Sequence, residues 1–200
     1  MTEKRFNRVV NSAIWAAYGD AFGFITELAD TNILKSRLDG DTYVADLRSW
    51  KRRIGGIHGA FVSLPKGIYS DDTQLRLATS RSISSDGTFD VEAFAKVELP
   101  VWQSYSLGAG RGSKLAAANL SKSNVSYFSN FYSEKNASYV LSGGNGASMR
   151  IQPHVWSRPA HADTQRIIFD VFLNTICTHG SMVAIVGAVF HALCLKASLE

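Results

Sequence analysis

The sequence contains only two cysteines and four prolines among its 200 residues. Cys177 and Cys194 both lie within apolar helical patterns, and no cysteine and histidine spacing is typical of a zinc site. We therefore expect two small core residues in a reducing compartment, and a cytoplasmic protein, rather than a disulfide framework.

Long apolar runs are also scarce. The longest, residues 182–195, is interrupted by Gly187 and His191 and is shorter than the ~20 residues that a membrane-spanning helix needs. The apolar segment of residues 14–17 is too short for a signal peptide and is soon followed by Asp20. These features predict no membrane association.

Charge of either sign is moderate, with 19% charged residues and a formal net charge of +4. A mildly basic chain favours anionic ligands without requiring nucleic acid. The one compact basic cluster is Lys51-Arg52-Arg53, beside Trp50. It could contact a phosphate backbone, but a run of three charges is more often a solvated surface, so nucleic acid is the less favoured partner.

Helical periodicity dominates the chain and predicts an all-α fold in a single domain over residues 1–200. Apolar residues recur every three or four positions over residues 4–28, which predicts a helix with one broad buried face. Further helices are expected at about residues 73–84, 91–105 with a kink at Pro100, 114–120, 159–174 and 181–197. Residues 30–69 and 121–139 lack a clear period and are interpreted as long irregular connections, the first of them functional.

Two carboxylates follow one another in Ser70-Asp71-Asp72-Thr73, directly before an apolar helix. Two such charges do not share a desolvated pocket unless a cation neutralises them or one is protonated, so the pattern indicates a divalent-metal site. The alternative is an ordinary helix cap, in which Ser70 or Asp72 satisfies the first amide groups.

A second acidic pair lies at the end of the first predicted helix. Glu27 follows Asp20 by seven residues, about two helical turns, so both carboxylates are expected on nearly one face. Gly19 and Gly23 lie beside them and favour the close approach of either a ligand or another helix.

Two glycine-rich segments and one helix break complete the pattern. Residues 108–114 lack the Walker spacing and are interpreted as a flexible turn at a helix start, with a contact to a diphosphate as the alternative. Residues 143–146 leave their backbone amides unshielded, so that phosphates or ribose could approach closely. Thr178-His179-Gly180 separates two apolar helices.

In this order and spacing, the four segments around Asp20 to Glu27, Ser70 to Thr73, Gly143 to Arg150 and His179 resemble the ADP-ribosylglycohydrolase family, which includes the dinitrogenase reductase activating glycohydrolases. The resemblance implies an orthogonal all-α bundle with long functional loops and a pair of Mg²⁺ ions, or Mn²⁺, in an ADP-ribose cleft. It implies metal ligation by Ser70, Asp71 and Asp72, and catalytic roles for Glu27, Asp71 and Asp72. It further implies substrate contacts by Ser142, Gly143, Gly144, Asn145 and His179, and an orienting role for Asp20.

The implied reaction is hydrolysis of the glycosidic bond between ADP-ribose and a protein or other acceptor. The family's late Gly-Asp-x-Asp-Thr/Ser segment is absent, because no aspartate follows His179. We therefore expect an incomplete metal site and a C-terminally incomplete chain. Two functions are favoured, a Mg²⁺-dependent ADP-ribosylglycohydrolase and a catalytically silent ADP-ribose-binding or regulatory module. A purely structural helical domain is the third alternative and the least favoured, because it leaves the acidic and glycine-rich motifs unexplained.

Overall fold

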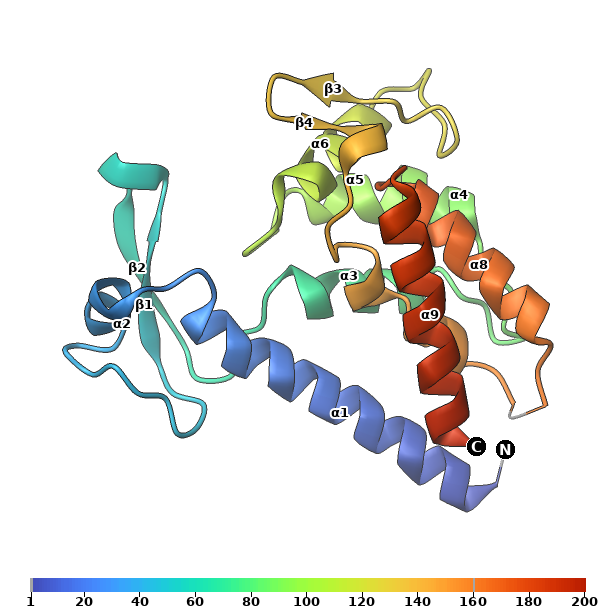
Figure 1. Ribbon diagram of the computed structural model, residues 1–200, viewed down its shortest axis with the longest axis horizontal. Coiled ribbons are helices and arrows are strands. Elements are labelled where there is room, and N and C mark those ends of the chain that lie inside the picture. The colour runs from blue at the N-terminus through green and yellow to red at the C-terminus, as the bar shows by residue number, and fades with distance from the viewer. Residues whose placement is uncertain (1, 160) are drawn as a thin grey trace.

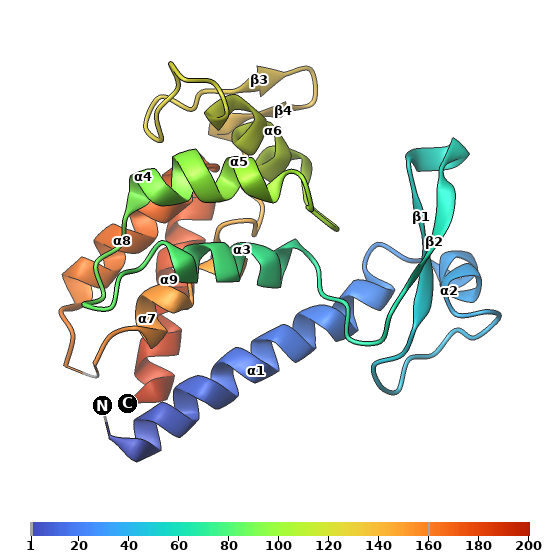
Figure 2. The same cartoon turned by 180° about the vertical axis from the view of Figure 1, so that it is seen from behind.

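A computed structural model describes residues 2–159 and 161–200, and it is mostly helical, as predicted. The orthogonal arrangement of the bundle stays a prediction. A long helix, α1, connects a small lobe to a larger helical body, and the two described ends of the chain lie close together beside α1 and α9 (Figures 1 and 2). The elements, in chain order, are α1 (Glu3–Thr26), α2 (Thr31–Arg37), β1 (Trp50–Ile54), η1 (Gly56–His58), β2 (Ala60–Leu64), α3 (Asp71–Arg81), α4 (Val91–Ala93), η2 (Phe94–Glu98), α5 (Leu99–Trp102), α6 (Arg111–Leu120), β3 (Ser133–Glu134), β4 (Ala137–Ser138), η3 (Tyr139–Leu141), η4 (Ser148–Arg150), α7 (Pro153–Trp156), α8 (Thr164–Ile176) and α9 (Met182–Leu199).

The small lobe corrects the prediction of an irregular connection over residues 30–69. It consists of α2 and an antiparallel hairpin in which Trp50 pairs with Leu64 and Ile54 with Ala60. Only Trp50 and Leu64 are buried in the two strands, so the hairpin lacks the alternation of apolar and polar residues that reveals a strand in a sequence. At its tip, a Cβ on Gly59 would lie 1.9 Å from the carbonyl oxygen of Ile54, so this turn requires glycine.

Four apolar clusters lie within the described residues, the smallest of them around Ala116, Tyr132 and Tyr139. The largest joins α3, α5 and α6 through the fully buried side chains of Leu75, Leu99, Trp102 and Leu120. A second lies between α7, α8 and α9, and a third joins the end of α1 to the lobe through residues such as Phe24 and Trp50. The lobe therefore packs on the same end of α1 that carries Glu27.

The broad buried face predicted for the first helix is wrong over most of its length. Phe6, Ile14 and Leu28 are 52%, 60% and 89% exposed, and burial of apolar side chains is confined to Ala21, Phe24 and Ile25. The cause is visible in Figure 1, where the middle of α1 runs between the body and the lobe. The apolar periodicity predicted the helix correctly, but it did not predict which of its turns are buried by the rest of the protein.

The kink expected at Pro100 takes the form of a π-helical segment, η2, between α4 and α5. Proline has no amide hydrogen to donate within a helix, and the wider turn places the hydrogen bond from Leu99 N on the carbonyl of Phe94 instead. The helical path therefore continues from Val91 to Trp102 without a break.

Two further predictions need correction in the last third of the chain. The helix expected from residue 159 begins at Thr164, where the Asp163 side chain accepts a hydrogen bond from the Gln165 amide. Cys177 is buried, but Cys194 is exposed, because burial on α9 follows Ala184, Ala188 and Ala192 and Cys194 lies two positions beyond that series.

Helix α9 is longer than its uninterrupted apolar run and covers 18 residues with a mean hydropathy of 1.9. Within the described residues it is the one helix long and apolar enough to cross a bilayer, and 22% of it is buried. Core helices of other proteins meet the same criteria, so length and composition alone assign it no membrane role.

Candidate active site

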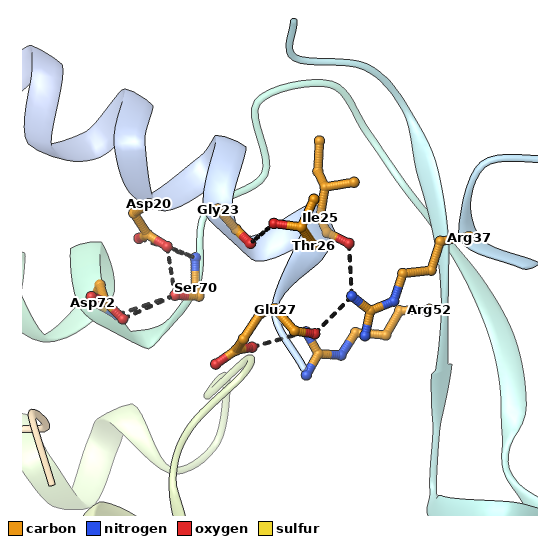
Figure 3. A network of polar contacts seen from close by, with 9 residues as sticks. All are labelled: Asp20, Gly23, Ile25, Thr26, Glu27, Arg37, Arg52, Ser70 and Asp72. Carbon is orange, nitrogen blue, oxygen red and sulfur yellow. Dashed lines mark hydrogen bonds and ion pairs between the residues drawn. The ribbon is translucent and has the colours of Figure 1, made fainter. Parts of the chain in front are cut away.

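The centre of the site is the start of α3, which is fixed from α1. Asp20 accepts hydrogen bonds from the Ser70 amide at 3.0 Å and the Ser70 hydroxyl at 2.5 Å (Figure 3). It also accepts one from the Thr73 amide at 2.9 Å. Ser70 is the N-cap of α3, and its hydroxyl accepts a long hydrogen bond from the Asp72 amide. The cap predicted as the alternative to a metal site is therefore present, and Asp20 orients it.

Asp71 follows the N-cap and lies in the first turn of α3, where it is only 6% exposed. Asp72, a second acidic residue, lies next to it. Burial, followed by the negative charge of Asp72, raises the pKa of Asp71 to about 7. Burial and the charge of Asp20 also raise the pKa of Asp72, while the Arg76 guanidinium opposes that change. The start of α3 thus concentrates negative charge that a bound cation would stabilise.

Two cavities open on this acidic end of α3. One, of about 360 Å³, is lined by Asp20, Glu27, Ser70 and Asp72 together with Gly19 and Gly23. A Cβ on either glycine would meet no atom within 4 Å, so these glycines border open space rather than another helix.

The second cavity, of about 490 Å³, gathers segments that are far apart in the sequence, and we call it the central cavity. Its lining includes Glu27, Asp71, Asp72, Ser142, Gly144, Asn145, His179 and residues 108–113. Gly143 lies outside it and borders a neighbouring hollow with Ser142 and Gly144. The volume is within the range of small-molecule sites.

Glu27 lies at the C-terminal end of α1, at the rim of both cavities. Its side chain is 41% exposed, and its Oε2 atom is 3.5 Å from Arg52 Nη1 on β1. Its carbonyl oxygen accepts a hydrogen bond from Arg37 Nη1 at 2.9 Å, so α2 and β1 both hold this residue (Figure 3).

The glycine-rich segment before α6 approaches the acidic residues more closely than the sequence indicated. Gly108 has φ +86°, and a Cβ there would lie 2.8 Å from the Phe24 ring and 3.3 Å from Asp71 Oδ1. Gly110, the N-cap of α6, provides no side-chain cap, so the first amides of this ten-residue helix are left for another acceptor. The segment is a wall of the central cavity as well as a turn.

The opposite wall is built around His179. Its Nδ1 atom is 2.6 Å from the Thr178 hydroxyl, and a Cβ on Gly146 would lie 2.7 Å from its ring. Burial and the charge of Arg150 lower the pKa of His179 to about 3, so the imidazole is neutral near pH 7. A neutral ring can donate or accept one hydrogen bond at the cavity.

Two residues that support this wall were assigned no role from the sequence. Arg150 is fully buried and donates to the carbonyl oxygen of Gly146, to Asn174 and to the Thr178 hydroxyl. The Tyr132 hydroxyl is 2.6 Å from the Ser142 hydroxyl and donates to the Thr178 carbonyl. Arg150 ends the glycine motif and could have been suspected, whereas Tyr132 lies in a segment without a pattern.

The donors fit part of a magnesium or manganese shell. Ser70, Asp71 and Asp72 offer only oxygen atoms, the ligands that hard cations prefer, and burial together with the charge of Asp72 raises the pKa of Asp71. Among the described residues, however, no three acidic, histidine or cysteine side chains converge as a metal-binding group. Metal binding by the three oxygen donors at the start of α3 therefore stays a prediction.

The fold and site define a helical protein with an acidic helix start facing two glycine-rich walls. The family model for ADP-ribosylglycohydrolase matches residues 1–200, and the chain belongs to this family. This finding confirms the resemblance inferred from the four ordered segments. A comparison with curated proteins gives no match.

Proposed function

We propose that this chain carries the substrate-binding and acidic residues of a Mg²⁺-dependent ADP-ribosylglycohydrolase. The observation that carries the proposal is the central cavity, where Glu27, Asp71 and Asp72 face the glycine walls and His179. Family membership supports a glycohydrolase and a substrate that contains ADP-ribose.

The walls suit the charged part of ADP-ribose. The uncapped amides at the start of α6 and the backbone of Gly144 to Gly146 would donate hydrogen bonds to the diphosphate. The neutral imidazole of His179, fixed by Thr178, would hydrogen bond a ribose hydroxyl. These contacts would place the glycosidic bond toward the acidic residues.

Glu27 is the residue best placed to handle the attacking water. It lies at the rim where the two cavities meet, and Arg52 and the backbone contact from Arg37 restrict its orientation. Its carboxylate would accept a proton from the water as general base or align it toward the anomeric carbon of ribose. The leaving group would depart past the same rim.

Ser70, Asp71 and Asp72 would hold the cation. When bound, Mg²⁺ or Mn²⁺ would lower the pKa of a coordinated water and fix ribose hydroxyls. Asp20 would keep Ser70 in place through the bonds described above.

Titration calorimetry tests the proposal by adding ADP-ribose with Mg²⁺ or with EDTA, alongside turnover of ADP-ribosylated arginine and serine peptides. We expect binding that requires Mg²⁺ and is lost in an Asp71→Ala/Asp72→Ala variant. An Asp39→Ala/Asp41→Ala variant is the matched control, because both residues are exposed ion-pair partners on the lobe. Binding that is unchanged in EDTA and in the site variant would contradict a metal-dependent site.

A second candidate is a silent ADP-ribose-binding or regulatory module. It is favoured by the incomplete set of metal donors among the described residues. It predicts that ADP-ribose binds with little response to Mg²⁺ and that no acceptor is released. Mg²⁺-dependent cleavage by the chain would exclude it.

A further inference from the structure

The lobe contains a cavity of about 620 Å³ that belongs to neither cavity of the candidate active site. It lies between α2 and the hairpin, and we call it the arginine cavity. It is lined by three cationic side chains, Arg37, Arg52 and Arg53, and by three apolar ones, Leu28, Ile33 and Phe61.

Positive charge prevails in the arginine cavity. Asp30 is the only acidic residue in its described lining, and its carboxylate accepts a hydrogen bond from the Ile33 amide at the start of α2. Burial, and to a smaller extent the charge of Arg52, lower the pKa of Arg37, while the charge of Glu27 opposes this change. The buried Nη1 atom of Arg52 has no hydrogen-bond partner among the described residues, and its nearest carboxylate is Glu27 at 3.5 Å. An anion in the cavity would relieve this imbalance.

The arginine cavity adjoins the candidate active site at two residues. Arg52 and Leu28 line both the arginine cavity and the central cavity. Leu28 follows Glu27 with φ +51°, a conformation that costs a leucine ~1–2 kcal/mol, and its side chain is 89% exposed. The fold thus holds an apolar residue in a strained conformation directly after Glu27, where the two cavities adjoin.

We propose that the arginine cavity is an acceptor subsite, which binds an acidic side chain of an ADP-ribosylated protein next to the modified residue. The proposal rests on the proposed function, because it assigns the acceptor side of the same reaction. A carboxylate would take the bidentate geometry that guanidinium groups favour, with Leu28, Ile33 and Phe61 contacting the neighbouring apolar part of the peptide.

The charges outside the cavity favour a peptide over nucleic acid. Lys51, Arg48 and Lys66 each form an ion pair, with Asp39, Asp41 and Asp46 respectively. A phosphate backbone requires a series of positive charges along a surface. Here these three surface charges are each paired with an aspartate, whereas three guanidinium groups and one carboxylate line a single cavity. That distribution suits a single anionic group surrounded by apolar contacts.

The test compares two ADP-ribosylated peptides that differ only in glutamate or glutamine beside the modified residue, each prepared with modified arginine and with modified serine. We expect kcat/KM to favour the glutamate peptide by on the order of tenfold, chiefly through KM, as for one charge-assisted hydrogen bond. Arg53→Gln should abolish that preference and leave cleavage of the glutamine peptide unchanged. Arg37 and Arg52 are left intact, because both contact Glu27.

Lys51→Gln is the matched control, since it removes a neighbouring charge on β1 that is paired with Asp39 outside the cavity. It should retain the preference for glutamate. In addition, Arg53→Glu should reverse the preference and favour a lysine-flanked peptide, a gain that a folding defect cannot produce.

Binding measured by calorimetry on the same peptides separates this proposal from the proposed function. If the chain binds the glutamate peptide more tightly through Arg53 but cleaves neither peptide, the acceptor subsite is supported and only the proposed hydrolysis is contradicted. Equal affinity and equal kcat/KM for the two peptides would overturn the acceptor subsite. Cleavage of an ADP-ribosylated oligonucleotide that depends on Arg53, without a glutamate effect in peptides, would also overturn it in favour of nucleic acid.

Discussion

The hydroxyl of Ser70 donates a hydrogen bond of 2.5 Å to the carboxylate of Asp20, although the two residues are fifty positions apart. The same carboxylate accepts from the amides of Ser70 and Thr73, so it ties the start of α3 to α1. The contact fixes both the cap of a helix and the position of the acidic residues that follow it.

Replacing Asp20 with asparagine should therefore disturb stability and the site together. An amide side chain has one acceptor oxygen in place of two and turns a donor toward groups that already donate, so we expect a loss of ~1–3 kcal/mol in the free energy of unfolding. Urea unfolding measures it, and Mg²⁺ affinity should fall in parallel. Asp41→Asn, on an exposed ion pair with Arg48, should change stability by less than ~0.5 kcal/mol. Equal losses of stability in the two variants would contradict a stabilising role for the hydrogen bonds between Asp20 and the start of α3.

Asp71 should make the metal-free protein less stable as the pH rises. Its folded pKa is raised to about 7 from an ordinary value of 3.8, so the folded state binds the proton more tightly than the unfolded state does. The associated stability is fully present below pH 4 and is lost between about pH 4 and 7, by on the order of 4 kcal/mol. In EDTA, Asp71→Asn should remove this loss when unfolding is measured across the range. A variant with the same pH dependence as the parent would refute the raised pKa.

Arg150 should be the most costly buried cation to replace. Its guanidinium group contacts Gly146, Asn174 and Thr178, and removal leaves those groups buried and unpaired. Arg150→Met should destabilise the protein by ~3–5 kcal/mol, and Arg150→Lys should recover only part, because an ammonium group cannot span the same acceptors. Arg48→Met, at a half-exposed ion pair, is the control. Denaturant midpoints that differ little between Arg150→Met and Arg48→Met would contradict this role.

The opposite pH trend is expected from His154. Both ring nitrogens are buried and have no hydrogen-bond partner among the described residues, and burial lowers the pKa of His154 to about 3. In the unfolded state His154 takes up a proton near pH 6.5, whereas in the folded state it does so only near pH 3. The free energy of unfolding therefore falls as the pH drops from 6.5 toward 3. His154→Leu should make acid unfolding shallower and, near pH 7, be neutral or stabilising by ~1 kcal/mol. A steeper acid transition in the variant would contradict the buried neutral histidine.

Local signals in the sequence were sufficient for much of the helical fold. The periodicity before Glu27, the break at Thr178 to Gly180 and the helix ending at Leu120 all correspond to observed boundaries within a few residues. The hairpin was missed because its strands are mostly exposed, and burial along α1 was overestimated because periodicity indicates a face but not its partner.

The residues of the candidate site likewise fall into those that the sequence indicated and those that it did not. Glu27 and Asp71 could be selected from the sequence because acidic residues beside glycine and hydroxyl groups form a recognisable pattern. The contribution of Tyr132 could not, since it depends on a hydrogen bond to Thr178, 46 residues away. The arginine cavity was also beyond reach, because it requires α2 to face a hairpin that the sequence did not predict. The functional roles of the site residues stay predictions.

The close approach of Gly108 gives a final prediction with a control in the same loop. Its φ of +86° disfavours any side chain, and a Cβ would lie 2.8 Å from the Phe24 ring and 3.1 Å from Ser70 Cβ. Gly108→Ala should therefore cost ~2–4 kcal/mol of stability and displace the wall from Asp71, weakening ADP-ribose binding measured with Mg²⁺. Gly110 has φ −65° and open space at its Cβ position, so Gly110→Ala should lose only the few tenths to ~1 kcal/mol of an N-cap preference. Equal losses of affinity in the two variants would mean that the loop acts through flexibility rather than through the contact of Gly108 with the acidic residues.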